Sequence, residues 1–290
     1  MTSTGLCSVF GNMSIDNDFY VSLPSNVDNK LFPRNTNGHY KTQLEHELHL
    51  ESGKWEVGLA EFHYTKSFHN IKGGGVAFYE HDEALSSSAG LKPGKGIFLK
   101  RLLKVPAAHY RSLADMVNAL SSSLQGSALE EAFSIRINYN RRATVVYNPS
   151  PEVRRRVRRV KLYGDFSRAL GFGALFPLTP GAMKKGPMAA DVNRGMTGLF
   201  IYTNVVDRHL VGDSFVPLLR VVPVRRSDSP FENVAIEFSN VQYHEVGNFH
   251  GREIEVQVRR DTGKTVNFNA GKVLVVLHFR KTRRALEQSV

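Results

Sequence analysis

Short apolar segments separated by polar turns recur along the chain, most clearly in its last third. Val216–Val224, Arg252–Arg259 and Lys272–Arg280 each have strand length and are rich in β-branched residues. In the last two segments apolar residues recur at every second position, at Val256 and Val258 and at Val273, Val275, Leu277 and Phe279, so each segment can bury one face. Asp261–Lys264 lies between them and contains Gly263, which predicts a hairpin turn. This pattern predicts an antiparallel β-sandwich.

The first two thirds of the chain add further predicted strands. Trp55–Tyr64 gives the strongest signal, because apolar Trp55, Val57 and Leu59 alternate with Glu56 and Gly58. We therefore expect the only tryptophan of the chain to be buried in the sandwich. The other strands predicted in this part lie at Asp18–Leu23, His39–Leu50, Val76–Tyr79, Ile97–Val105, Ala132–Asn140, Arg142–Asn148 and Val160–Tyr163.

One segment has helical rather than strand periodicity. Ser112 can cap a helix over Leu113–Leu124, in which apolar residues recur every three or four positions. A second, short helix is predicted at Phe166–Leu170. Ala84–Gly96 and Pro177–Asn193 contain Gly and Pro together with small or polar residues, which predicts two long loops.

Length and composition limit the possible architectures. The chain has 290 residues, of which 41% are hydrophobic, so it can form one large all-β domain or two small ones. It contains one cysteine, Cys7, which excludes an intrachain disulfide and a CxxC zinc site. The single cysteine favours folding in a reducing compartment. We expect no signal peptide, because the N-terminus lacks a basic region followed by a long apolar run, and no membrane anchor, because no apolar run has the length of a membrane helix.

The formal net charge is +11, which favours nucleic acid, anionic membranes or acidic proteins as partners. A basic run contributes much of it, and its six cations repel one another unless solvent or anions separate them. Two interpretations stay open: a solvated loop or strand edge, or a patch that contacts nucleic acid or an acidic partner. Few aromatic residues interleave with the run, so stacking on single strands is not predicted. The run comprises Arg154, Arg155, Arg156, Arg158, Arg159 and Lys161.

No catalytic, metal or cofactor site is predicted. Gly263-Lys264-Thr265 resembles the end of a phosphate-binding loop, but Val258 stands where that motif needs glycine. Two other groups contain suitable residue types without a matching spacing, and we expect them to be structural. They are His63, His69 and His81 with nearby carboxylates, and Asp207, His209, Asp213 and Ser214.

Two blocks of the sequence resemble the penton, or minor capsid, proteins of Polinton/Maverick elements and of related adintovirus- and adomavirus-type viruses. The first block comprises FYVSLPSN at Phe19–Asn26, HYKTQLEHELHL at His39–Leu50 and GKWEVGLAEFHY at Gly53–Tyr64. The second comprises IYTNVVDRHLVGDSFVPLLRVVPV at Ile201–Val224 and GKVLVVLHFRK at Gly271–Lys281. HYRSLADMVNAL and SRALGF, between the blocks, are also similar to segments of this family.

The resemblance implies an all-β fold, a single jelly-roll β-sandwich with one inserted helix and long loops. It implies a non-enzymatic capsid protein that forms homopentamers at the vertices of an icosahedral virion. The partners it implies are the neighbouring major capsid (hexon) protein and, as a further candidate, packaged DNA. Assembly is expected inside the host cell, in the nucleus. The corresponding division of the chain is a flexible arm at 1–17, a jelly-roll capsid domain at 18–281 and a basic tail at 282–290.

The termini supply the remaining candidate contacts. Arg283 and Arg284 extend the set expected to face nucleic acid or the inner capsid. Phe10, Phe19 and Tyr20 are candidate contacts of an N-terminal arm with a neighbouring subunit. A soluble nucleic-acid-binding protein that acts through the basic run is the alternative function, and a hydrolase is a more distant one.

Overall fold

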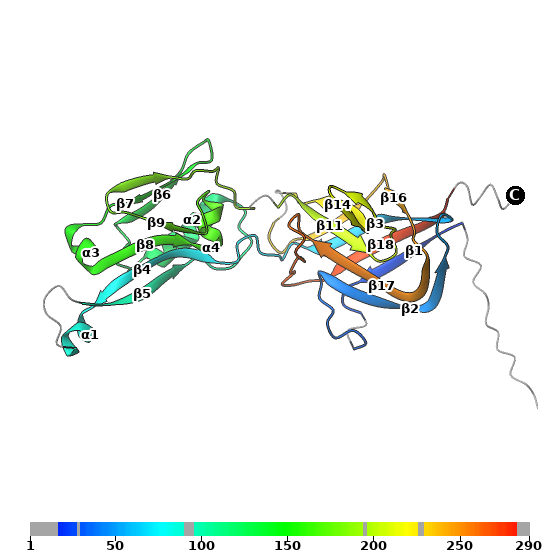
Figure 1. Cartoon of the computed structure of the whole chain (residues 1–290), viewed down its shortest axis with the longest axis horizontal. Helices are drawn as coiled ribbons and strands as arrows, with labels where there is room; N and C mark the ends of the chain where they lie inside the picture. Colours follow the sequence, from blue (N-terminus) through cyan, green and yellow to red (C-terminus); the bar gives the residue numbers. More distant parts are fainter. Residues whose placement is uncertain (1–16, 28–29, 90–95, 194–195, 226–228, 283–290) are drawn as a thin grey trace, which may run out of the picture.

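The computed structural model describes residues 17–27, 30–89, 96–193, 196–225 and 229–282. Strands make up 49% of the chain and helices 12%, and the sheets are antiparallel, which confirms the predicted all-β class. Figure 1 shows two lobes that lie end to end. Buried apolar residues form one cluster in each lobe. The first cluster uses both ends of the chain, and the second lies between Ile71 and Val192.

The lobe built from the two ends of the chain, here called the jelly-roll lobe, contains eight main strands. One sheet has the order β1-β18-β3-β15 and the other β14-β11-β17-β2. Counted along the chain, these orders are 1-8-3-6 and 5-4-7-2, which is the arrangement of a jelly roll with its two Greek keys. The strands are β1 Asp18–Pro24, β2 His39–Leu50, β3 Trp55–Thr65, β11 Gly198–Thr203, β14 Leu218–Pro223, β15 Asn233–Glu237, β17 Phe249–Arg259 and β18 Val273–Lys281.

Alternating side chains of the two sheets fill the core of this lobe. Trp55 is only 7% exposed, as predicted from its strand pattern. The Phe19 ring stacks on Phe279 at 4.8 Å and meets the edge of Trp55 at 5.6 Å between ring centroids. The Tyr40 hydroxyl donates a hydrogen bond of 2.8 Å to the carbonyl of Leu23, which satisfies the polar end of a buried ring. These contacts join β1 to β2, β3 and β18.

The turn at Asp261–Lys264 forms as predicted, with Gly263 at φ +76°. The Gly263 N–H donates to the Arg260 carbonyl at 2.9 Å, and Arg259 bridges to Thr265. The prediction that this turn joins β17 and β18 as a hairpin is wrong, because these strands belong to opposite sheets. Periodicity shows that a strand buries one face but does not tell which sheet it joins. Two smaller elements complete this lobe, the hairpin of β12 His209–Val211 and β13 Ser214–Val216, and β16 Tyr243–Glu245 beside β3.

The inserted lobe lies between β3 and β11 and contains its own two sheets, of order β5-β4-β8-β9 and β10-β7-β6. Helix α2, Leu113–Leu124, has the predicted bounds, and the predicted Ser112 cap accepts a hydrogen bond from the Asp115 N–H. The predicted inserted helix is thus one element of an inserted lobe that also contains two sheets. The other elements are β4 Gly74–Asp82, α1 Glu83–Ser88, β5 Ile97–Lys104, β6 Phe133–Ile137, β7 Ala143–Tyr147, α3 Pro151–Arg156, β8 Val157–Tyr163, α4 Gly164–Ala169, β9 Leu175–Pro177 and β10 Ala182–Lys185.

Three segments of the inserted lobe are more ordered than predicted. Helix α1 occupies the start of the loop predicted at Ala84–Gly96, and its Asp82 cap accepts from the Leu85 N–H. Strand β10 lies within the loop predicted at Pro177–Asn193 and pairs with β7. The first part of the basic run forms α3, which Ser150 caps. Each correction has the same origin, because short polar segments form helices or strands when capping and a neighbouring strand satisfy their backbone groups.

The two lobes are joined through a buried asparagine. Asn70 is 2% exposed, and its amide nitrogen donates to the Tyr110 carbonyl at 2.8 Å and to Asn193 Oδ1 at 3.1 Å. Its amide oxygen accepts from the Tyr110 N–H at 2.9 Å. The side chain therefore links the chain segments that enter and leave the inserted lobe. His109 lies beside it and contacts the Phe68 ring edge-on, at 5.5 Å between ring centroids.

Acid is expected to weaken this junction through His109. Its Nδ1 donates to the Phe68 carbonyl at 3.0 Å. Burial lowers the pKa of His109, nearby Lys66, His69 and Arg260 act in the same direction, and the Phe68 carbonyl opposes them. The unfolded chain binds a proton at this histidine near pH ~6.5, whereas the folded chain does so only at lower pH. Its contribution to stability is therefore complete above that pH and is lost as the pH falls below it.

The measurement is thermal unfolding of the wild type and of His109→Gln at about pH 7.5 and about pH 5.5. Glutamine does not titrate, so the variant should lose less stability on acidification than the wild type. An equal loss in both proteins would contradict a role of His109 in this response.

Candidate functional site: a basic sheet face in the inserted lobe

Nearly all of the net charge lies in the inserted lobe. Residues 71–193 contain 19 Lys plus Arg and 9 Asp plus Glu, a net charge of +10. The rest of the chain contains 19 Lys plus Arg and 18 Asp plus Glu, a net charge of +1. The jelly-roll lobe and its termini are thus almost neutral as a whole. A polyanion would therefore be attracted to the inserted lobe.

A β-bulge places two successive arginines on the same face of a sheet. The pairing of β4 with β8 shifts register between Ala77 and Tyr79. Arg159 sits in the bulge with φ +53°, a conformation that non-glycine residues adopt only at some cost. Without the bulge, Arg158 and Arg159 would point to opposite faces. With it, both are exposed between buried Val157 and Val160.

Two aromatic rings lie among these cations. The Arg158 guanidinium carbon lies 4.2 Å from the centroid of the Phe98 ring, and that of Arg159 lies 5.8 Å from the Tyr79 centroid. Tyr79 pairs with Lys100 of β5 on one side and with Arg158 of β8 on the other, so cations flank its ring across the sheet. We call the surface formed by Tyr79, Phe98, Lys100, Arg158, Arg159 and Lys161 the basic face.

The expectation that few aromatic residues accompany the basic run is therefore wrong in three dimensions. Tyr79 and Phe98 are far from the run in sequence, and strand pairing brings them next to it. The segment GIFLKRLLK around Phe98 offered a partial signal, because cations follow an aromatic residue on a predicted strand. The pairing partner of that strand could not be read from the sequence.

The remaining members of the run have different surroundings. Arg154 and Arg155 are exposed on α3. Arg156 forms a salt bridge of 3.2 Å with Glu80, which also contacts Arg101 at 3.3 Å. Lys161 is half-buried opposite Ala77. Arg158 and Arg159 are therefore better placed than Arg156 to contact a polyanion.

Of the terminal candidates, the structure describes Phe19 and Tyr20. Phe10, Arg283 and Arg284 lie outside the described residues. Phe19 packs into the core of its own chain, whereas Tyr20 is 64% exposed and stacks on His278 at 4.3 Å between ring centroids. The described chain starts and ends at the end of the jelly-roll lobe remote from the inserted lobe (Figure 1).

The other candidate groups stay separate. His63 contacts Glu61 at 2.8 Å on β3, His69 lies at the junction and His81 lies in β4. Among the described residues, no three His, Cys, Asp or Glu side chains come together as metal ligands would. Asp207, His209, Asp213 and Ser214 lie around the β12–β13 hairpin, where His209 stacks on His244. None of the helices in the described ranges has the length and apolar character that a membrane crossing requires.

Comparisons with known proteins give structural matches only. No family model matches the chain, and neither does any curated protein. A crystal structure of the mavirus penton protein is similar, with 10% identity, 91% of this chain and 99% of that chain covered, and a TM-score of 0.45. A structure of the Sputnik virophage is also similar, with 8% identity, 91% and 98% coverage, and a TM-score of 0.41. The assignment as a jelly roll rests on the strand order of this chain.

Proposed function

We propose that this chain is a structural virion protein, a penton-like capsid protein that forms homopentamers at capsid vertices. The jelly-roll strand order carries the proposal, because two apposed four-stranded sheets make a rigid wedge-shaped unit used in viral capsids. A structural role requires no catalytic group, and no enzymatic activity is proposed. The expected neighbours are other copies of this chain and a major capsid protein.

The blocks that resemble penton proteins coincide with jelly-roll strands. FYVSLP ends β1, HYKTQLEHELHL is β2, and WEVGLAEFHY begins β3 at Trp55. The second block spans β11 to β14 and ends with β18. These strands belong to both sheets and form the core described above. The family resemblance therefore follows the framework of the fold and supports the capsid interpretation.

Exposed apolar side chains on the jelly-roll lobe support self-association. Leu210 and Phe215 pair across the β12–β13 hairpin and are 62% and 65% exposed. Val221 on the edge strand β14 and Tyr20 on the edge strand β1 are exposed as well. Large apolar residues on edges and projecting hairpins are typical of surfaces that become buried on assembly. In a closed ring each contact would be heterologous, joining one side of a subunit to the opposite side of its neighbour.

The basic face is proposed to bind a polyanion. Arg158 and Arg159 on an aromatic sheet face offer both charge and rings on which bases can stack, so single-stranded DNA is a suitable probe. Arg158→Gln/Arg159→Gln should weaken binding and make log K less steep against log salt by roughly 0.7 for each lost phosphate contact. Thermal stability should change little, because exposed charges contribute little individually.

The matched control is Lys184→Gln/Lys185→Gln, which removes the same charge from exposed β10 in the same lobe. It should retain the wild-type salt dependence. Equal slopes of log K against log salt for the wild type and both double variants would contradict a role of the basic face. Arg158 and Arg159 would then be part of a solvated surface.

A soluble nucleic-acid-binding protein is the alternative, and the concentration of charge in one lobe favours it. The two functions differ in assembly. Negative-stain electron microscopy of the purified protein should show fivefold rings if the capsid proposal is correct. Leu210→Ser/Phe215→Ser should reduce the rings without lowering the unfolding temperature. A wild type that stays monomeric under all assembly conditions yet binds DNA would favour the alternative.

A further inference from the structure

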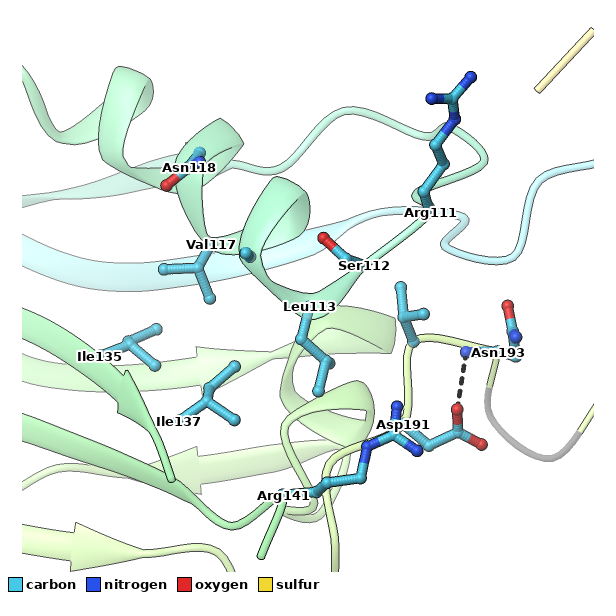
Figure 2. A pocket seen from close by; sticks show the side chains of 12 residues that line it. Arg111, Ser112, Leu113, Val117, Asn118, Ile135, Ile137, Arg141, Asp191 and Asn193 are labelled. Atoms are coloured by element: carbon cyan, nitrogen blue, oxygen red, sulfur yellow. Dashed lines mark hydrogen bonds between the residues drawn. The ribbon is translucent and has the colours of Figure 1, made fainter. Parts of the chain in front are cut away.

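A groove in the inserted lobe separates helix α2 from strand β6. Its larger part is a cavity of about 480 Å³, and a second cavity of about 330 Å³ shares Val117 and Ile135 with it. Figure 2 shows Ile135 and Ile137 pointing from β6 toward the helix, and Leu113 pointing from the helix toward the strand. The cavities follow α2 from Arg111 to Leu124 and Gln125. The groove therefore has an apolar floor along the length of the helix.

Strand β6 presents unpaired backbone groups to its outer side. It ends its sheet, whose order is β10-β7-β6, and in the described part of the chain no strand pairs with its other edge. The Asn138 N–H donates to the Arg142 carbonyl at 3.1 Å, which fixes the alternation of hydrogen-bonded pairs between β6 and β7. By that alternation, the N–H and C=O groups of Ile135 and Ile137 point away from β7.

The groove has room for one additional strand. The other sheet of this lobe has four strands, β5-β4-β8-β9, whereas the sheet that ends at β6 has three. A helix of 12 residues is about 18 Å long, and a strand of five residues spans about 17 Å. A short strand beside β6 would therefore match the length of the groove and pair the free groups of Ile135 and Ile137.

The charges at the mouth specify one end of the ligand. Arg111 precedes α2, and Arg141 follows β6 in the left-handed conformation, with φ +55°. Both are exposed, and neither forms an ion pair with another residue in the described ranges. At the other end, Glu130 accepts a hydrogen bond from the Gly126 N–H. Asp191 also lines this end of the cavity, but the two arginines outnumber it, so a carboxylate on the ligand would be favoured at the Arg141 end.

We propose that this groove binds an extended peptide of another protein as an added strand of β6. The peptide would have apolar side chains at alternate positions and an acidic residue near Arg141. A second copy fits less well, because its own β6 carries a flanking α2 that would compete for the same space. This site goes beyond the proposed capsid function and does not depend on it.

The test uses fluorescence anisotropy with the full chain and a labelled peptide, Glu-Val-Thr-Val-Thr-Val. Two N-methylated versions block the amides along one edge of the peptide strand or the other. Strand addition uses one edge only, so one version should bind about tenfold more weakly and the other nearly normally. Replacing the peptide's Glu by Lys should weaken binding to the wild type, and Arg141→Glu should reverse that preference.

Variants of α2 provide the matched test on the protein. Val117→Trp fills the groove and should lower affinity at least tenfold, while Ser122→Trp, on an exposed part of the same helix outside both cavities, should bind as the wild type does. If Val117→Trp lowers the unfolding temperature, the comparison of the two N-methylated peptides still tests the proposal, because it uses the wild-type protein. Absence of saturable binding, or equal losses with both methylated peptides, would overturn the proposal. The proposal would also be overturned if the wild type did not bind the peptide but formed a dimer, and if Val117→Trp abolished that dimer. A second copy of this chain would then occupy the groove.

Discussion

Trp55→Ala is expected to lower the free energy of unfolding by about 3–5 kcal/mol, because a large buried ring is replaced by a cavity. The ring meets Phe19, and the Lys281 ammonium lies 5.9 Å from its centroid. Trp55 also pairs with Lys281, and its carbonyl accepts the Val246 N–H at 3.0 Å. The residue thus lies where β3, β18 and the β16 segment meet. Loss of the ring should loosen all three.

Denaturant unfolding followed by circular dichroism measures this cost. The control is Tyr20→Ala, which removes an exposed ring from strand β1 of the same sheet and should change stability by about 1 kcal/mol or less. A cost of Trp55→Ala within that small range would contradict the packing described. A fluorescence maximum of native Trp55 typical of an exposed ring would contradict it independently.

Asn70→Ala is expected to cost about 3 kcal/mol and to uncouple the two lobes. The substitution removes all three hydrogen bonds of the side chain and leaves the backbone N–H and C=O of Tyr110 without these partners in a buried place. A buried polar group that loses its partner incurs most of its desolvation cost, so the loss exceeds that of an exposed amide. Among the described residues, the His109 side chain supplies a further link at the junction, to the Phe68 carbonyl.

Two probes separate the lobes in this experiment. Trp55 fluorescence reports on the jelly-roll lobe, and circular dichroism reports on both lobes. The wild-type transitions should coincide, and those of Asn70→Ala should separate, because cooperative unfolding needs contacts between the lobes. Asn118→Ala, on the exposed surface of α2, should leave the transitions together. Unchanged unfolding of Asn70→Ala would show that other contacts hold the lobes.

Local signals predicted the framework of the jelly-roll lobe well. Trp55, Val57 and Leu59 alternate with less buried positions because one face of β3 packs into the core and the other is partly exposed, and such alternation is visible in a sequence. Helix α2 was equally visible, since its Ser112 cap and apolar spacing are local features. The division of the chain into a single domain at 18–281 stays a prediction. The structure describes two separate clusters of buried apolar residues within that range.

The inserted lobe was hidden because periodicity does not identify the core that a strand faces. β4, β5 and β8 have the composition expected of sandwich strands, yet they pack around Phe78, Leu162 and Phe166 rather than around the jelly-roll core. The basic face was missed for the same reason, since Phe98 and Arg158 come together only through β4. One local signal did exist. Val157-Arg-Arg-Val160 breaks the period of two, and such a break is typical of a bulge.

Mass photometry of the purified full chain tests the central claim most directly. A homopentamer has five times the 32.5 kDa mass of one chain, and this species should dominate under conditions that promote assembly. It should decline in Leu210→Ser/Phe215→Ser, whose monomer should remain folded. A wild type found only as a monomer or as a stable dimer in every condition would contradict the proposal that this jelly roll closes a fivefold vertex.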